Sequence, residues 1–330
     1  MNMSHEAAGM EEQKFKSLIK SRNTKELSII VVFALIVIVL SFASPYFMTV
    51  NNLTNILLQS SNIMLVAIGM TFIFISGNMD LSLGSIEALS SAVVSVVLVN
   101  MGMPLPIALL AAIAGGMLCG LVNGTLVAYF HFPPFIATLG MQSIARGLGL
   151  MVTGGVAVYG FPKSFSIIGK GKIWLIPVPV ILFGILLVFA HIVLKHTKYG
   201  TNVFAVGSNE QAAGLSGINV KRIKLSVYVM SGIMAAIAGI VMTSRLNSGQ
   251  ATIGEYDVMD TVAAVAIGGT SMRGGVGSIR GTFIGVMIIS TIKNGLNLLG
   301  VDAYVQQVAV GIIIIVAILI DQISKNELKR

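Results

Sequence analysis

The sequence contains few charged residues. Lys, Arg, Asp and Glu together make up 10% of its 330 residues, against roughly 25% in soluble globular proteins. Hydrophobic residues make up 55%, and the mean hydropathy is +0.90. A soluble protein of this length must cover more of its surface with polar side chains than this composition allows. The composition therefore excludes a soluble enzyme and a disordered chain, and it indicates an integral membrane protein.

Cysteine and histidine are also scarce. Cys119 is the only cysteine, so an internal disulfide is excluded. The four histidines are scattered without the spacing of metal ligands, and we expect no metal site. The sequence lacks G-x-x-x-x-G-K-[ST], H-E-x-x-H and G-x-S-x-G, which mark ATPases, zinc proteases and serine hydrolases. We therefore expect no catalytic residue and no ATPase activity in this chain, and an intramembrane enzyme is a disfavoured alternative.

Long apolar runs, by contrast, are abundant. An α-helix rises about 1.5 Å per residue, so about 20 residues cross a hydrocarbon core of about 30 Å. Six runs without charge are long enough: 28–48, 56–75, 104–130, 174–194, 225–244 and 303–320. Four weaker pieces contain a charge or are short: 86–101, 135–152, 261–269 and 281–292. These runs predict an all-α membrane bundle of about ten transmembrane helices, or eight if both short pairs are re-entrant.

Basic residues gather on one side of this arrangement. With the N-terminus in the cytoplasm, the inside segments hold 15 of the 21 Lys and Arg residues. These segments are 1–27, 76–85, 131–134, 195–224, 270–280 and 321–330. This is the positive-inside pattern, and it explains the net charge of +8 without nucleic acid. We expect a cytoplasmic tail over 1–27, a lipid-embedded domain over 28–322 and a cytoplasmic tail over 323–330.

Two glycine-rich stretches, 76–86 and 268–281, interrupt the apolar pattern. Broken helices in transporters often mark the transport path or its gate, and non-helical backbone at membrane depth must be buried or face water. Gly84 before Ser85 predicts a helix start, with Glu87 in the first turn. The path or gate candidates are Asn62, Asp80, Ser82, Ser85, Glu87, Gln142, Gly274, Gly275 and Gly277.

Three ionisable residues fall at or near membrane depth, namely Asp80, Glu87 and Arg146. Such groups are costly in lipid and usually face a cavity or a partner. Asp80 fits a solute path and a helix cap equally well, whereas Arg146 favours a structural ion pair with a carboxylate. A secondary transporter that uses Asp80 or Glu87 as a proton site remains an alternative at this point.

Two trios of glycines have i, i+4, i+8 spacing, which places each trio on one helix face. They are Gly116, Gly120 and Gly124, and Gly277, Gly281 and Gly285. In membranes, small residues let helix backbones approach closely. The spacing therefore predicts helix–helix packing rather than a ligand site.

The longest inside loop, 195–224, contains a short helix signal. Ser208 and Gln211 fit the S-x-x-Q capping box, which predicts a helix that begins at Asn209, and Gly217 fits its end. Two helical turns are not stable alone in water. We therefore expect this helix to dock on a partner.

Four stretches carry a family resemblance: SGNMDLSLGS at 76–85, FAVGSNEQAAGLSGINVKRIK at 204–224, RLNSGQ at 245–250 and AIGGTSMRGGVGSIRGTFIG at 266–285. Together they resemble the permease subunits of bacterial binding-protein-dependent ABC importers of the ribose, arabinose, galactose and xylose type. The resemblance implies a ten-span permease with pseudo-symmetric halves in the inner membrane, which passes a monosaccharide inward. Asn78 and Met79 depart from the Gly-Ile often found there, and we expect a stiffer turn.

The resemblance also implies partners. Two permease copies, as a homodimer or a related heterodimer, sit on two ATP-binding subunits, and a periplasmic or lipid-anchored binding protein delivers the sugar. ATP and Mg belong to the ATPase partner, and no cofactor is expected in this chain. The implied coupling residues are Gly207, Ser208, Asn209, Glu210, Gln211, Ala212, Ala213, Gly214 and Gly217. A permease for a branched-chain amino acid or another small polar solute is a further alternative.

Overall fold

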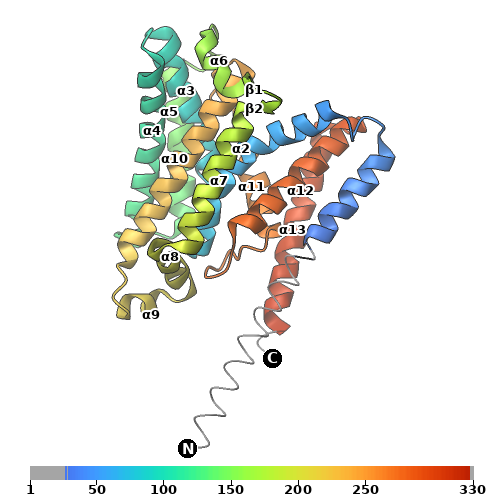
Figure 1. Ribbon diagram of the computed structural model, residues 1–330. Helices are drawn as coiled ribbons and strands as arrows, with labels where there is room; N and C mark the ends of the chain where they lie inside the picture. The colour runs from blue at the N-terminus through green and yellow to red at the C-terminus, as the bar shows by residue number, and fades with distance from the viewer. Residues whose placement is uncertain (1–26, 28, 328–330) are drawn as a thin grey trace, which may run out of the picture.

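The computed structural model describes residue 27 and residues 29–327. The chain forms a bundle of helices with a short hairpin at one end (Figure 1). The first half contains Ile29–Ala43, α2 (Val50–Ile75), α3 (Leu83–Ser95), a π-helical turn (Val96–Asn100), α4 (Leu105–Ala128), α5 (Pro134–Thr153), α6 (Lys163–Lys170) and α7 (Val178–His196). The second half contains α8 (Lys198–Ser208), α9 (Glu210–Leu215), α10 (Val220–Leu246), α11 (Asp257–Ile267), α12 (Ile279–Leu298) and α13 (Ala303–Glu327).

Helices α8 and α9 lie at one end of the bundle, which we term the loop end (Figure 1). The far end carries α6 and the antiparallel hairpin of β1 (Lys172–Ile173) and β2 (Ile176–Pro177). Helices α4, α5, α7 and α10 run between these two ends (Figure 1). The predicted all-α polytopic membrane fold is confirmed.

The helix lengths refine the predicted spans. Within the described residues, six helices are long and apolar enough to cross a membrane. Two of them, Leu83–Asn100 and Pro134–Thr153, come from runs that the sequence marked as weaker. The run at 28–48 yields a shorter helix, Ile29–Ala43, because the chain turns at 45–48. Since α11 has only 11 residues, it is too short to cross alone.

Helix α2 is the centre of the bundle. Its residues from Ser60 to Ile75 are buried, and α10, α11, α12, α7 and α8 all contact it. A helix that is apolar on every face is stable only when other helices surround it. The predicted trio of Gly116, Gly120 and Gly124 lies inside α4, but Gly277 precedes α12, which begins at Ile279, so the second trio does not share one helix face. A side chain at Gly120 of α4 would collide with the carbonyl of Tyr228 on α10, and one at Gly285 of α12 with that of Ala264 on α11.

Both broken stretches are non-helical, as predicted, but one boundary differs. Helix α3 begins at Leu83 rather than near Ser85, so Glu87 lies in its second turn. The reason is local: an Asp80 carboxylate oxygen accepts hydrogen bonds from the Ser82 backbone N–H at 2.9 Å and from its hydroxyl at 2.6 Å. These bonds order the chain before Gly84. Since Asp80 and Ser82 are fully buried, this backbone is shielded from lipid.

Candidate transport and coupling sites

The cytoplasmic loop predicted at 195–224 contains two helices, and the sequence predicted one. Helix α8 was missed. Val203 and Val206 of α8 are buried, and the Tyr199 hydroxyl lies 2.9 Å from that of Ser226 on α10. Burial of the ring raises the pKa of the Tyr199 phenol, so the phenol stays protonated and suited to this hydrogen bond. Helix α8 is therefore fixed to the bundle.

The short helix α9 begins one residue later than predicted. Ser208 is the last residue of α8, and Asn209 is extended, with φ of −159°. The Asn209 side chain, rather than that of Ser208, accepts the capping bond from the Ala212 N–H at 2.9 Å. Gly217 follows the helix with φ of 82°, and the next N–H bonds back to Ala213, so the predicted end is confirmed.

One face of α9 is free of contact with the bundle. Gln211, Ala212 and Gly214 are exposed, and Leu215 is 91% exposed. Ala213 points the other way and is buried in the bundle. An exposed leucine at the tip of a loop is typical of a docking surface.

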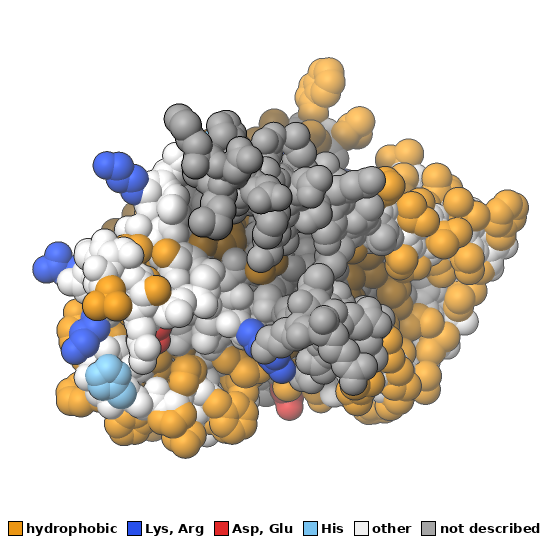
Figure 2. Space-filling model, turned by 90° about the horizontal axis from the view of Figure 1, so that it is seen from below, with side chains coloured by type: hydrophobic (Ala, Val, Ile, Leu, Met, Phe, Trp, Pro, Cys, Tyr) orange, Lys and Arg blue, Asp and Glu red, His pale blue; other side chains and the backbone are white. Residues whose placement is uncertain are grey.

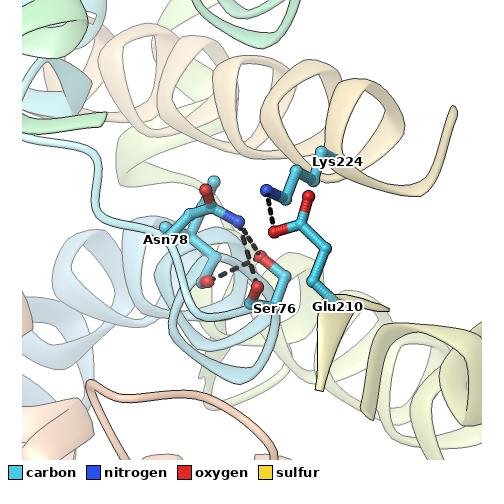
Figure 3. Close-up of polar contacts among 5 residues, drawn as sticks. Ser76, Asn78, Glu210 and Lys224 are labelled. Atoms are coloured by element: carbon cyan, nitrogen blue, oxygen red, sulfur yellow. Dashed lines mark hydrogen bonds and ion pairs between the residues drawn. The ribbon is translucent and has the colours of Figure 1, made fainter. Parts of the chain in front are cut away.

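Charged residues surround this loop, and one ion pair links it to α10. Glu210, at the start of α9, forms an ion pair of 2.6 Å with Lys224 of α10 (Figure 3). Seen from the loop end, Lys and Arg side chains stand out on one side of the face above a hydrophobic rim (Figure 2). The exposed basic residues around the loop are Lys195, Lys198, Lys221 and Arg222. The loop end thus combines a basic surface with an apolar tip.

Three glycine-rich segments that are distant in the sequence meet at the end of α8. A side chain at Gly207 would collide with the carbonyl of Ile75, the last residue of α2. The same carbonyl accepts a hydrogen bond of 2.9 Å from the N–H of Gly275. Gly274 and Gly275 have φ of 90° and 74°, a conformation that favours glycine. We term this contact of Ile75, Gly207, Gly274 and Gly275 the glycine junction.

The turn after α2 is fastened by a side chain. The Asn78 amide donates to the carbonyl of Ser76 at 3.0 Å and to its hydroxyl at 2.9 Å, close to the Glu210–Lys224 pair (Figure 3). The Tyr228 hydroxyl donates to the carbonyl of Met79 at 3.1 Å. Asn78 therefore anchors the turn beside the glycine junction, where Gly77 lies close to Gly207.

The starts of α3 and α11 meet at a buried amide. The Asn62 side chain donates to Glu87 at 2.8 Å and to Asp257 at 2.6 Å. Asn62 belongs to α2, so one side chain links the central helix to both broken spans. Of these three residues, only Asp257 was absent from the predicted candidates, because a charge at the edge of an apolar run looks like a span boundary.

Arg146 does not make the predicted ion pair among the described residues. Its guanidinium donates to the carbonyls of Ala251 at 2.5 Å and Ile253 at 2.8 Å. These carbonyls belong to the non-helical segment before α11, where helical partners are missing. Arg146 therefore supports the backbone of a broken span.

The other path candidates do not form one lining. Ser85 is buried beside the Glu87 turn, whereas Gln142 lies on the exposed face of α5. Gly277 packs against the side chain of Ile75 near the loop end. The structure thus separates these residues into a cluster inside the bundle, a cluster at the loop end and one exposed position.

A polar cavity lies beside the Asn62 bridge, with a volume of about 220 Å³. Lys293 of α12 pairs there with Asp260 of α11 at 2.5 Å, and Arg245 of α10 donates to the carbonyl of Leu58 at 3.0 Å. Its lining residues are Gln59, Asn62, Ile63, Met242, Arg245, Asp257, Asp260, Ser290, Lys293, Asn297 and Gln306. Most of these residues were not predicted, since they come from five helices.

Comparison with known proteins identifies the family of this chain. The family model described as branched-chain amino acid transport system / permease component matches residues 52–318. The chain belongs to this family. A ribose import permease of Bacillus subtilis (strain 168) is 43% identical over 290 residues, which cover 87% of this chain and 90% of the relative. One from Escherichia coli (strain K12) is 42% identical over 301 residues, 90% and 93% of the two chains.

A xylose transport system permease of Escherichia coli (strain K12) is 31% identical over 361 residues, which cover 90% of this chain and 92% of the relative. These relatives confirm the resemblance to sugar-type ABC permeases. They are transport subunits, and the chain is accordingly a multi-pass membrane transport subunit.

Proposed function

We propose that this chain is the permease subunit through which a monosaccharide, a pentose or a hexose, crosses the bacterial inner membrane. The observation that carries the proposal is the identity of more than 40% to ribose import permeases over about nine-tenths of the chain. The more distant relatives named for xylose support the same class of solute.

The energy comes from ATP hydrolysis on a separate subunit. The exposed face of α9 and the basic surface around it are suited to dock on that subunit at the loop end. The loop end then faces the cytoplasm with both chain termini, in agreement with the positive-inside distribution. We expect ATP and Mg to act on the partner rather than on this chain.

The glycine junction offers a route for the motion. When the ATPase subunits close, α9 and α8 move, and Gly207 transmits the displacement to the end of α2 and to the turn before α12. The solute path then opens to one side or the other. A second permease copy, in a homodimer or a related heterodimer, completes the path, and a periplasmic or lipid-anchored binding protein delivers the sugar.

Substrate competition tests the proposal. The permease is reconstituted with its cognate ATPase and binding protein, and uptake of labelled D-ribose, D-xylose and D-galactose is measured. We expect ATP-dependent uptake of at least one sugar and no competition by L-leucine. Uptake of L-leucine and of none of the sugars would assign the permease to amino acids instead, the solutes for which its family is described.

A further inference from the structure

We propose that the polar cavity beside Asn62 binds one monosaccharide during its passage, an inference that rests on the proposed function. Nine of the eleven lining residues are polar, although the cavity lies among helices of a membrane protein. Polar groups at membrane depth are costly and usually serve a function. The volume of about 220 Å³ compares with about 30 Å³ for one water molecule in the liquid, so a small solute with several hydroxyl groups has room.

Two residues that line the cavity, Asn62 and Ser290, each carry a buried side-chain oxygen without a hydrogen-bond partner among the described residues. These atoms are the Asn62 side-chain oxygen and the Ser290 hydroxyl, on residues that are 4% and 1% exposed. Buried polar atoms in native proteins are nearly always paired. The wall of the cavity therefore holds two oxygens whose hydrogen-bonding capacity is unused within the described residues.

The chemistry of the lining suits a neutral polyol. A sugar hydroxyl both donates and accepts, and carboxylates, amides and a serine hydroxyl offer the complementary groups. The charged residues of the lining balance in number: Arg245 and Lys293 face Asp257 and Asp260, and Lys293 pairs with Asp260. An ionic solute would find little uncompensated charge.

The position of the cavity fits entry from outside. Arg245 and Asn297 are next to the last residues of α10 and α12, and Gln306 lies in the first turn of α13. Helix α10 starts beside α9, and α12 starts after the turn of the glycine junction, so these residues lie in the far half of the bundle. Helices α11 and α12 both line the cavity, and the 268–278 turn connects them to the glycine junction. Motion of the coupling loop therefore reaches the cavity walls directly.

A pair of matched serine variants tests the site in the complete transporter. Ser290→Ala removes a cavity hydroxyl, and Ser231→Ala removes an equally buried hydroxyl of α10, which also has no partner among the described residues but lies against Gly69. When sugar-loaded binding protein is saturating, we expect Ser290→Ala to slow sugar uptake about three- to tenfold, which corresponds to the loss of one hydrogen bond. Ser231→Ala should stay within twofold of the wild type. Equal rates for both variants would overturn the inference.

A second measurement reports occupancy. Ser290→Cys is made in a Cys119→Ala background and treated in proteoliposomes with a small methanethiosulfonate. We expect D-ribose, D-xylose or D-galactose, whichever the wild type transports, to slow this modification several-fold. Absent modification, or modification that the transported sugar does not slow, would overturn the inference while transport itself stands. If the wild-type complex moves no sugar, the proposed function fails instead.

Discussion

At the scale of single residues, the close contact at Gly207 controls how the coupling loop meets the bundle. Gly207 is inside α8 and its Cα faces the carbonyl of Ile75. The N–H of Gly275 bonds to the same carbonyl at 2.9 Å. Three backbone segments therefore meet with no space for a side chain, which makes the contact stiff.

Gly207→Ala should lower the melting temperature of the permease and the ratio of sugar transported to ATP hydrolysed. The added methyl group overpacks the junction, at a cost of about 1–3 kcal/mol. Gly214→Ala is the matched control, because Gly214 is also helical and the nearest atom to an added Cβ is 4.0 Å away. Alanine is the better helix former by about 1 kcal/mol, so the control should be neutral or stabilising. Equal destabilisation in both variants would contradict the junction.

Arg146 gives a second prediction at this scale. Arg146→Met leaves the carbonyls of Ala251 and Ile253 without a donor and should destabilise the permease by about 1–3 kcal/mol. Arg146→Lys keeps a donor, so its stability should lie between that of the wild type and that of Arg146→Met. Since the bonds go to backbone, adding Glu87→Gln to Arg146→Met should not restore stability in a double-mutant cycle. Restored stability would show that an ion pair with Glu87 dominates.

At the scale of elements, α9 is a six-residue helix that no isolated peptide would keep. It persists because Asn209 caps it, Ala213 packs inward and Glu210 bonds to Lys224. Its other face, with Gly214 and Leu215, has no partner among the described residues. Contacts with the bundle thus stabilise α9 and leave its other face available to a partner.

Gly214→Asp and Leu215→Asp should weaken capture of the ATPase subunit and reduce transport and solute-stimulated ATP hydrolysis together. Each places a charge into a packed interface, which typically costs several kcal/mol of binding. Both residues are exposed in the permease, so insertion and melting temperature should stay at wild-type values. Ala213→Asp is the contrasting variant, because it buries a charge in the permease itself and should lower its melting temperature. If Leu215→Asp captured as much ATPase subunit as the wild type does, α9 would not be the coupling element.

The sequence predicted the elements better than their contacts. Hydropathy located the spans because lipid demands long apolar runs, and glycine spacing located the close helix pairs. Helix α8 was missed because two glycines and several polar residues interrupt its apolar pattern, and its stability comes from packing on α2, α7 and α10. The cap of α9 was placed at Ser208 because serine and asparagine are both good caps. The polar cavity depends on pairs such as Asn62 and Asp257, which are 195 residues apart, and no local pattern reveals them.

At the scale of the whole molecule, we propose that the loop end lies in the cytoplasm and the far end outside. Single-cysteine variants in a Cys119→Ala background test this orientation. Gln211 and Leu175 are both exposed and lie at opposite ends of the bundle. In intact spheroplasts, an impermeant maleimide should label Leu175→Cys and leave Gln211→Cys unlabelled until the membrane is opened. The reverse labelling pattern would show that the loop end lies outside, where α9 could not contact a cytoplasmic ATPase.

The central claim is that a separate ATPase drives a sugar through this permease, and coupled transport in proteoliposomes tests it most directly. The permease, its ATPase and its binding protein are reconstituted, and initial uptake of the labelled sugar is measured with ATP inside. A parallel sample contains an ATPase that binds ATP and does not hydrolyse it. We predict uptake only with the active ATPase, together with ATP hydrolysis that rises when the loaded binding protein is added. Sugar uptake at the same rate with the inactive ATPase would contradict the account and establish a secondary transporter.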